Sequence, residues 1–141
     1  MAAAFYELFL RRLLDNNYDG NGAIDMNTDD IRNVLLTSGY SRNLTTHDFL
    51  NDLVIASNSP ASGGSAALTT EAVDADATFD SDDVSHTSVT TGSTITQSVL
   101  YKHTGTDTTS PLVANYDGFS QATNGGNITE QVHASGWFDL A

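Results

Sequence analysis

The chain has 141 residues and a mass of 15.0 kDa, which is enough for one compact domain. Its hydrophobic content of 39% can supply the core of that domain. Its 18 acidic and 5 basic residues give a formal net charge of -13, so we expect neither nucleic acid nor a membrane surface as a partner. The lack of cysteine removes disulfides, thiolate zinc sites and cysteine nucleophiles. No apolar stretch approaches the roughly 20 residues that cross a bilayer, and we expect no targeting segment.

Residues 1–20 are expected to form a short amphipathic helix and an attachment arm. Hydrophobic residues recur there at spacings of three and four, which places them on one helix face. These residues are Tyr6, Phe9, Leu10, Leu13 and Leu14. The Asn-, Asp- and Gly-rich segment from Asn16 to Asn27 then predicts a loop.

Residues 21–141 are expected to form a single β-rich domain. The β-branched and aliphatic run from Asp30 to Leu36 predicts a buried strand. Thr45 or Thr46 is expected to cap one further short helix, in which Phe49, Leu50, Leu53 and Val54 share a face. The Pro- and Gly-containing stretch at 58–65 predicts a flexible loop.

Seven short runs separated by turn signals follow this loop. They are Ala66 to Val73, Ala77 to Phe79, Val84 to Val89, Thr94 to Lys102, Leu112 to Tyr116, Ile128 to His133 and Trp137 to Leu140. Their spacing predicts a mainly β protein, with a single-domain antiparallel β-sandwich or jelly-roll-like fold. In the run from Thr94 to Lys102, polar and apolar residues alternate, so one face is expected to meet water. Because many runs hold few large apolar residues, we also expect the chain to form an oligomer.

The segment from Asp15 to Gly20 matches the first half of a calcium-binding loop, with oxygen donors at alternate positions and a glycine at the sharp turn. A complete loop needs a bidentate glutamate at its twelfth position, where this chain has Met26. A turn rich in Asn and Asp is therefore the favoured interpretation.

No other pattern predicts catalysis or metal binding. The four histidines lie in separate elements, and the acidic run from Asp80 to Asp83 fits a solvated turn better than a cation or catalytic site. No serine lies in a nucleophile elbow, and no glycine cluster fits a phosphate loop. We therefore expect no enzymatic activity, catalytic residue, metal or cofactor. The aromatic residues fit a core or a subunit interface better than a carbohydrate platform.

Four segments carry a family resemblance. The aromatic helix from Phe5 to Leu14 is followed by GAIDMNTDDIRNVLLTSGYSRNLTTHDFLNDL (Gly22 to Leu53), FDSDDVSHTSV (Phe79 to Val89) and SVLYKHTGTDTTSPLVANYDG (Ser98 to Gly118). In this order and spacing the chain resembles a family of small virion structural proteins of tailed bacteriophages, often described as capsid decoration proteins. It departs from the family pattern at Asn33, where a small apolar residue is usual, and at His103, where an acid is usual.

The resemblance implies a virion component and supplies no catalytic residues. The leading hypothesis is a decoration or cement protein on the outer capsid surface, which binds the major capsid protein of the assembled head and stabilises contacts between its subunits. We predict that aromatic side chains form the capsid or subunit interface. These are Phe5, Tyr6, Phe9, Tyr18, Trp137 and Phe138.

Two alternatives stay open. One is a tail or head-fibre component that takes part in attachment or in binding a host-surface glycan, and copy number in the virion separates it from a cement protein. The other is a calcium-dependent or glycan-binding module that uses the aromatic residues or the loop from Asp15 to Asp25. Titration with calcium and with glycans would distinguish it.

Overall fold

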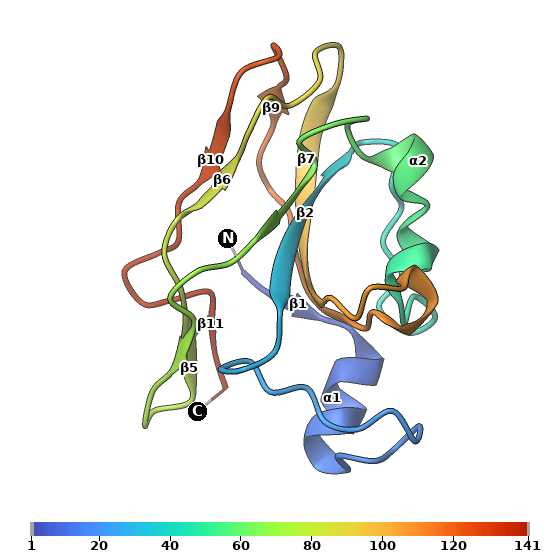
Figure 1. The fold of residues 1–141 in the computed structure, drawn as a ribbon, viewed down its shortest axis with the longest axis vertical. Helices are drawn as coiled ribbons and strands as arrows, with labels where there is room; N and C mark the ends of the chain where they lie inside the picture. The colour runs from blue at the N-terminus through green and yellow to red at the C-terminus, as the bar shows by residue number, and fades with distance from the viewer. Residues whose placement is uncertain (1, 141) are drawn as a thin grey trace.

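The computed structural model describes residues 2–140, and this part of the chain is mainly β, with antiparallel sheets and two short α-helices (Figure 1). The elements in chain order are β1 (Ala4–Phe5), α1 (Glu7–Leu14), β2 (Ile31–Thr37), the 3-10 helix η1 (Leu50–Leu53), α2 (Ile55–Asn58), β3 (Ser65–Ala67), β4 (Ala72–Val73), β5 (Thr78–Asp80), β6 (Val84–His86), β7 (Thr94–Lys102), the 3-10 helix η2 (Asp107–Thr109), β8 (Leu112–Tyr116), β9 (Gln121–Ala122), β10 (Ile128–Glu130) and β11 (Phe138–Asp139).

The largest sheet has six strands in the order β1-β8-β7-β2-β3, with β9 pairing the end of β7. Two smaller sheets, β10-β6 and β11-β5-β4, complete the β-structure of the described residues. In Figure 1 these smaller sheets lie on one side of the large sheet, whereas α2 lies on the other. The arrangement is consistent with a β-sandwich and confirms the predicted fold class at this level.

The strand predictions agree well with the structure. The strand expected from Asp30 to Leu36 is confirmed as β2, and each of the seven later runs overlaps an observed strand. The connection at 58–65 is hydrogen-bonded to β2, because Ser59 Oγ donates to the carbonyl of Leu35 at 2.7 Å. The N-terminal residues are also part of the large sheet, since Phe5 pairs with Ala114 of β8.

The core fills both faces of the large sheet. Leu100 packs with Phe9, Phe79 and other residues on the side of the smaller sheets. Its neighbour Val99 packs on the other side, with Leu53 among its partners. The expectation that one face of this strand meets water is therefore wrong at its centre, where the residues from Ser98 to Tyr101 are all buried. The cause is that layers cover both faces of β7.

Helix α1 forms, but it separates apolar residues that were predicted to share one face. The residues that it buries are Leu8, Phe9 and Arg12. Its exposed leucines are Leu10, Leu13 and Leu14, which were expected to share one helix face with Phe9. Two contacts fix how the helix is rotated: the pairing of β1 with β8, and the hydrogen bond of 2.8 Å from the Glu7 N–H to the carbonyl of Leu44.

The second predicted helix begins later and is broken. Asn43 Oδ1 accepts hydrogen bonds from the N–H groups of Thr45 and Thr46, so these threonines form a turn rather than a helix cap. The helical turn η1 starts at Leu50, and the left-handed conformation of Val54, with φ 49°, separates it from α2. Leu50 and Leu53 are buried, whereas Val54, which was expected to share their face, is exposed.

Candidate functional site

A pocket of about 810 Å³ opens between β1 of the large sheet and the β11-β5-β4 sheet. Three aromatic rings and three carboxylates are the main chemical groups of its lining. We call it the aromatic pocket and define it by Phe5, Trp137, Phe138, Asp74, Asp80 and Asp139. Residues near both ends of the described chain thus contribute to one site. It includes three of the six aromatic residues predicted as interface residues.

The floor of the pocket is a cluster of phenylalanines. The ring of Phe5 meets that of Phe138 edge-on, with 5.0 Å between their centroids. Phe9 stacks on Phe5 at 5.8 Å, and Phe79 lies 5.5 Å from Phe138. Phe9 and Phe79 are completely or almost completely buried, Phe138 is 8% exposed and Phe5 is half-buried, so the cluster presents mainly Phe5 to the pocket. The rings hold one another in place, which gives the pocket a preformed apolar floor.

Trp137 is held from two sides. Its Nε1–H donates a hydrogen bond of 2.8 Å to Ser81 Oγ, and its ring lies 5.3 Å from that of Tyr116. Burial raises the pKa of the Tyr116 phenol, so the hydroxyl stays protonated and donates to the carbonyl of Trp137 at 3.1 Å. The indole is therefore ordered before any ligand arrives.

A tight turn at 133–136 carries Trp137 into the pocket. The N–H of Gly136 donates to the carbonyl of His133 at 2.7 Å, and Gly136 has φ 78°. A Cβ at this position would lie 2.5 Å from the carbonyl oxygen of Phe79. Glycine is thus required here both for the backbone conformation and for the close approach to β5.

The carboxylates of the pocket are partly engaged by backbone donors. Asp74 Oδ1 accepts hydrogen bonds of 2.9 Å from the N–H groups of Asp76 and Thr78, which closes the turn between β4 and β5. Asp80 Oδ1 accepts from the N–H of Ser81 at 2.9 Å. These bonds orient the carboxylates of Asp74 and Asp80, and their donors are backbone N–H groups that carry no positive charge.

The lysine and arginine side chains of the protein lie elsewhere, and each is paired with an acid. The pairs are Arg11 with Glu7, Arg12 with Asp19, Arg32 with Asp30, Arg42 with Asp117 and Lys102 with Asp29. Within residues 2–140, no lysine or arginine lines the aromatic pocket, where His133 is the single basic group. The pocket is consequently negative in character.

The other predicted interface residues lie apart from the pocket. Tyr6 is completely buried on the opposite face of the large sheet, where its hydroxyl lies 2.9 Å from that of Tyr40. Tyr18 is exposed in the loop after α1, and its ring lies 5.1 Å from the guanidinium carbon of Arg11. The structure therefore brings Phe5, Trp137 and Phe138 together, with Phe9 beneath them, but not Tyr6 or Tyr18.

A second surface lies on α1. Leu10, Leu13 and Leu14 are exposed by 40%, 47% and 91%, and we call them the leucine ridge. Isolated exposed leucines are common, but three on one short helix form a continuous apolar strip. The spacing of the apolar residues placed these leucines on one helix face with Phe9. The structure buries Phe9 and exposes the leucines, because spacing alone does not say which side of a helix meets the protein.

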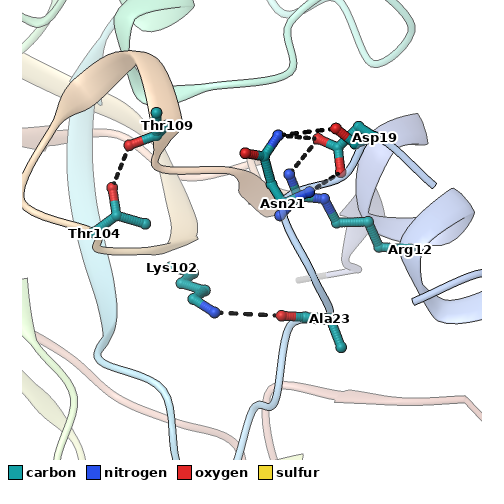
Figure 2. A network of polar contacts seen from close by, with 7 residues as sticks. All are labelled: Arg12, Asp19, Asn21, Ala23, Lys102, Thr104 and Thr109. Carbon is teal, nitrogen blue, oxygen red and sulfur yellow. Dashed lines mark hydrogen bonds and ion pairs between the residues drawn. The ribbon is translucent and has the colours of Figure 1, made fainter. Parts of the chain in front are cut away.

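In the loop that resembles half of a calcium site, other groups of the protein bind the carboxylates Asp15 and Asp19. The N–H groups of Asn17 and Asn21 donate to the side chains of Asp15 and Asp19, which are the expected Asx turns. Figure 2 shows the buried guanidinium of Arg12 against the Asp19 carboxylate, which Asn21 also contacts. Burial acts to raise the pKa of Asp19, but the hydrogen bonds from Arg12 and Asn21 outweigh it and hold that pKa below its usual value.

The loop is also fastened to the large sheet. Lys102 of β7 donates to the carbonyl of Ala23 at 3.3 Å (Figure 2) and forms an ion pair of 2.8 Å with Asp29. Arg12 and Lys102 thus supply the positive charge that a metal ion would bring. In the described part of the chain, no group of three or more metal-binding side chains is placed to hold an ion.

Several residues of the aromatic pocket could not be predicted as site residues from the sequence. Asp74 and His133 lie in unrelated segments, and only the packing of β11 against β5 brings them to one cavity. Ser81 belongs to the acidic run interpreted as a solvated turn, and the structure adds that this turn positions Trp137.

Comparison of the chain with protein-family models, with curated proteins and with solved structures finds no match. Between residues 2 and 140, no helix is long and apolar enough to cross a bilayer.

Proposed function

We propose that this protein is a structural component of the virion of a tailed bacteriophage, and specifically a capsid decoration or cement protein. In this role it binds the outer surface of the assembled head and stabilises contacts between subunits of the major capsid protein. The order of the four sequence segments from Phe5 to Gly118 supports this assignment, as does the lack of a catalytic constellation among the predicted site residues.

The observation that carries the proposal is the leucine ridge. Its helix is anchored at one end by the pairing of β1 with β8 and at the other by the ion pair of Arg12 with Asp19. A rigid apolar strip loses little conformational entropy when it docks on a preformed surface, which favours binding to an assembled lattice. We assign the ridge as the main attachment surface for the major capsid protein.

The mechanism is mass action on the assembled state. A ligand that binds the intact lattice but not its dissociated subunits stabilises the lattice by its binding free energy. The net charge of -13 suits such a ligand, because it keeps many copies soluble and repels stray nucleic acid.

Symmetric assembly belongs to the same proposal. We assign a homotrimer, with a dimer as the alternative, because several weak contacts that engage together bind a lattice more tightly than one. We also propose that the sandwich is jelly-roll-like and that α1 acts as an amphipathic helix, with Phe9 toward the core and the leucine ridge toward the capsid.

Binding to purified heads of the encoding phage tests the proposal. Deletion of residues 1–20 is unsuitable because it removes the buried side chains of Tyr6 and Phe9. The triple substitution Leu10→Ser, Leu13→Ser and Leu14→Ser changes exposed positions instead, and Val54→Ser, at another exposed apolar residue, is the matched control. We expect the wild-type protein and the control to co-sediment with heads in many copies and to raise their rupture temperature, and the triple variant to lose both effects.

Each outcome has a defined meaning. Failure of the wild-type protein to bind heads would overturn the cement function. Full binding by the triple variant would refute the leucine ridge as the attachment surface. Cryo-electron microscopy of the virion then counts the copies, and a few copies confined to the tail or a vertex would assign the protein to a tail or head fibre.

A further inference from the structure

Negative charge is concentrated beside the aromatic pocket. The segment at 69–83, which includes β4 and β5, contains six acidic residues and no lysine or arginine. The five basic side chains of the protein are all engaged in ion pairs in other regions. Because none of these five cations lies in the 69–83 segment, the local potential there favours a cationic partner.

The size and lining of the pocket further restrict the chemical class of the ligand. Its volume of about 810 Å³ is large enough for more than one side chain. The floor is aromatic, with Phe5 and Phe138 in edge-on contact, while Asp74 and Asp80 provide carboxylates in the same lining. Lysine and arginine combine an apolar stem with a cationic head, and both parts find a complementary surface here.

The strands that border the pocket suit a polypeptide. β1 is the terminal strand of the large sheet, and β11 is the terminal strand of its own sheet. Phe5 of β1 and Phe138 of β11 both line the pocket, so a ligand in it lies between two sheet edges. Sheet edges bind extended peptides through their backbones, while pockets select the side chains.

From these observations we propose that the aromatic pocket binds an extended basic segment of a partner protein, in which an arginine or lysine alternates with an apolar residue. The partner is thus defined by positive charge and an apolar anchor. This inference goes beyond the cement function and does not depend on it, because it uses a different surface from the leucine ridge.

Fluorescence of Trp137 provides a direct test, because this is the only tryptophan of the chain and lies in the pocket. Three end-blocked hexapeptides serve as ligands: one alternates Arg with Leu, one alternates Glu with Leu, and one alternates Arg with Ser. We expect a saturable change in fluorescence with the Arg–Leu peptide, and weaker binding of that peptide at high salt. The Glu–Leu peptide should not bind, and the Arg–Ser peptide should bind several-fold more weakly.

Substitutions in full-length protein locate the binding. Asp80→Asn should weaken binding of the Arg–Leu peptide roughly two- to fivefold, as expected for a partly exposed ion pair. The control Asp107→Asn removes the same charge from η2, away from the pocket, and should leave the affinity unchanged. Ala72→Arg places a cation at an exposed position of the lining and should abolish binding. Thermal unfolding of each variant shows that the fold is retained.

Three results would overturn the inference. The first is no fluorescence response to the Arg–Leu peptide at millimolar concentration. The second is binding of the Glu–Leu or Arg–Ser peptide as tight as that of the Arg–Leu peptide. This result would mean that the pocket does not require both a positive charge and an apolar side chain. The third is an equal loss of affinity in Asp80→Asn and Asp107→Asn, which would reduce the effect to net charge.

Discussion

Ser98 of β7 donates a hydrogen bond of 2.6 Å to Glu130 Oε1 of β10, across the interface between the large sheet and the β10-β6 pair. A second polar contact lies on the same face of that pair, where His86 Nε2 donates to Asn33 Oδ1 of β2 at 2.9 Å. Ser98, His86 and Asn33 are all fully buried. Two polar contacts thus fix how the small sheet docks, and both involve titratable groups.

The first prediction concerns the ionisation of Glu130. Burial raises the pKa of this carboxyl above its usual value of 4.5, and the hydrogen bond from Ser98 opposes the shift only in part. Protonation therefore stabilises the folded state, fully so below pH 4.5, and this contribution is lost as the pH rises through the folded pKa. Glu130→Gln keeps an oxygen acceptor for Ser98 without the charge, so it should unfold at higher urea concentration than wild type at neutral pH.

Urea unfolding from pH about 4.5 to about 8 measures this effect. Glu71→Gln, in the segment before β4, makes the same chemical change and should leave the pH dependence of wild type intact. A wild-type pH slope that persists in Glu130→Gln would show that another group is responsible.

The second prediction concerns His86, which acts with the opposite sign. Burial lowers its pKa from 6.5 to about 4, so the neutral imidazole is the form that the fold accepts. The associated stability is present above pH 6.5 and is lost as the pH falls through about 4, by about 3 kcal/mol in total. Because Glu130 compensates in the same pH range, the loss should be measured in the Glu130→Gln background.

Nuclear magnetic resonance of the imidazole ring provides the matching readout, with an expected pKa of about 4 for His86. The exposed residue His133 supplies the control, since His133→Gln should not alter the acid loss of stability. A midpoint for His86 close to 6.5 would refute the prediction.

The strands could be predicted from the sequence because their signal is local. Turn residues such as Asp117-Gly118 interrupt short β-branched runs, so the ends of β7 and β8 follow from neighbouring residues alone. The face of α1 could not be predicted in this way. Its orientation depends on a strand pairing with β8, more than 100 residues away in the chain, as the pairing of Ala4 with Asn115 shows.

The polar residue Asn33 in the otherwise apolar strand β2 also has a structural reason. In an apolar strand an isolated asparagine looks like a defect, but here its side chain pairs with His86. Neither residue predicts the other, because 53 positions separate them in the chain. The aromatic pocket was predictable in part: large aromatic residues marked Phe5, Trp137 and Phe138, whereas no local pattern connected them with Asp74.

The third prediction concerns the buried guanidinium of Arg12. Its ion pair with Asp19 is shielded from water on the arginine side, where the side chain is only 2% exposed. Asp19→Asn leaves the buried charge without its partner and should cost about 3 kcal/mol of unfolding free energy. Glu7→Gln, which breaks the exposed ion pair of Arg11 on the same helix, should cost less than about 0.5 kcal/mol.

Calcium provides an independent check on the same site. Because Arg12 already neutralises Asp19, millimolar calcium should not raise the melting temperature of the wild-type protein. A marked rise would instead support a calcium-dependent module. Equal costs for Asp19→Asn and Glu7→Gln would contradict the assignment of Arg12 as a buried charge that depends on Asp19.

The fourth prediction concerns Gly136, which sets the position of Trp137 in the aromatic pocket. Both Gly136 and Gly125 have positive φ, 78° and 84°, so Ala at either site pays the same left-handed strain of about 1–2 kcal/mol. At Gly125 the added Cβ meets no atom within 4 Å, whereas at Gly136 it meets the carbonyl oxygen of Phe79 at 2.5 Å. Gly136→Ala must therefore push the 133–136 turn away from β5.

We expect Gly136→Ala to lower the free energy of unfolding by more than Gly125→Ala does. We also expect it to shift the fluorescence of Trp137, which Gly125→Ala should leave unchanged. Equal stabilities of the two variants with an unshifted Trp137 spectrum would show that the turn does not depend on this close approach.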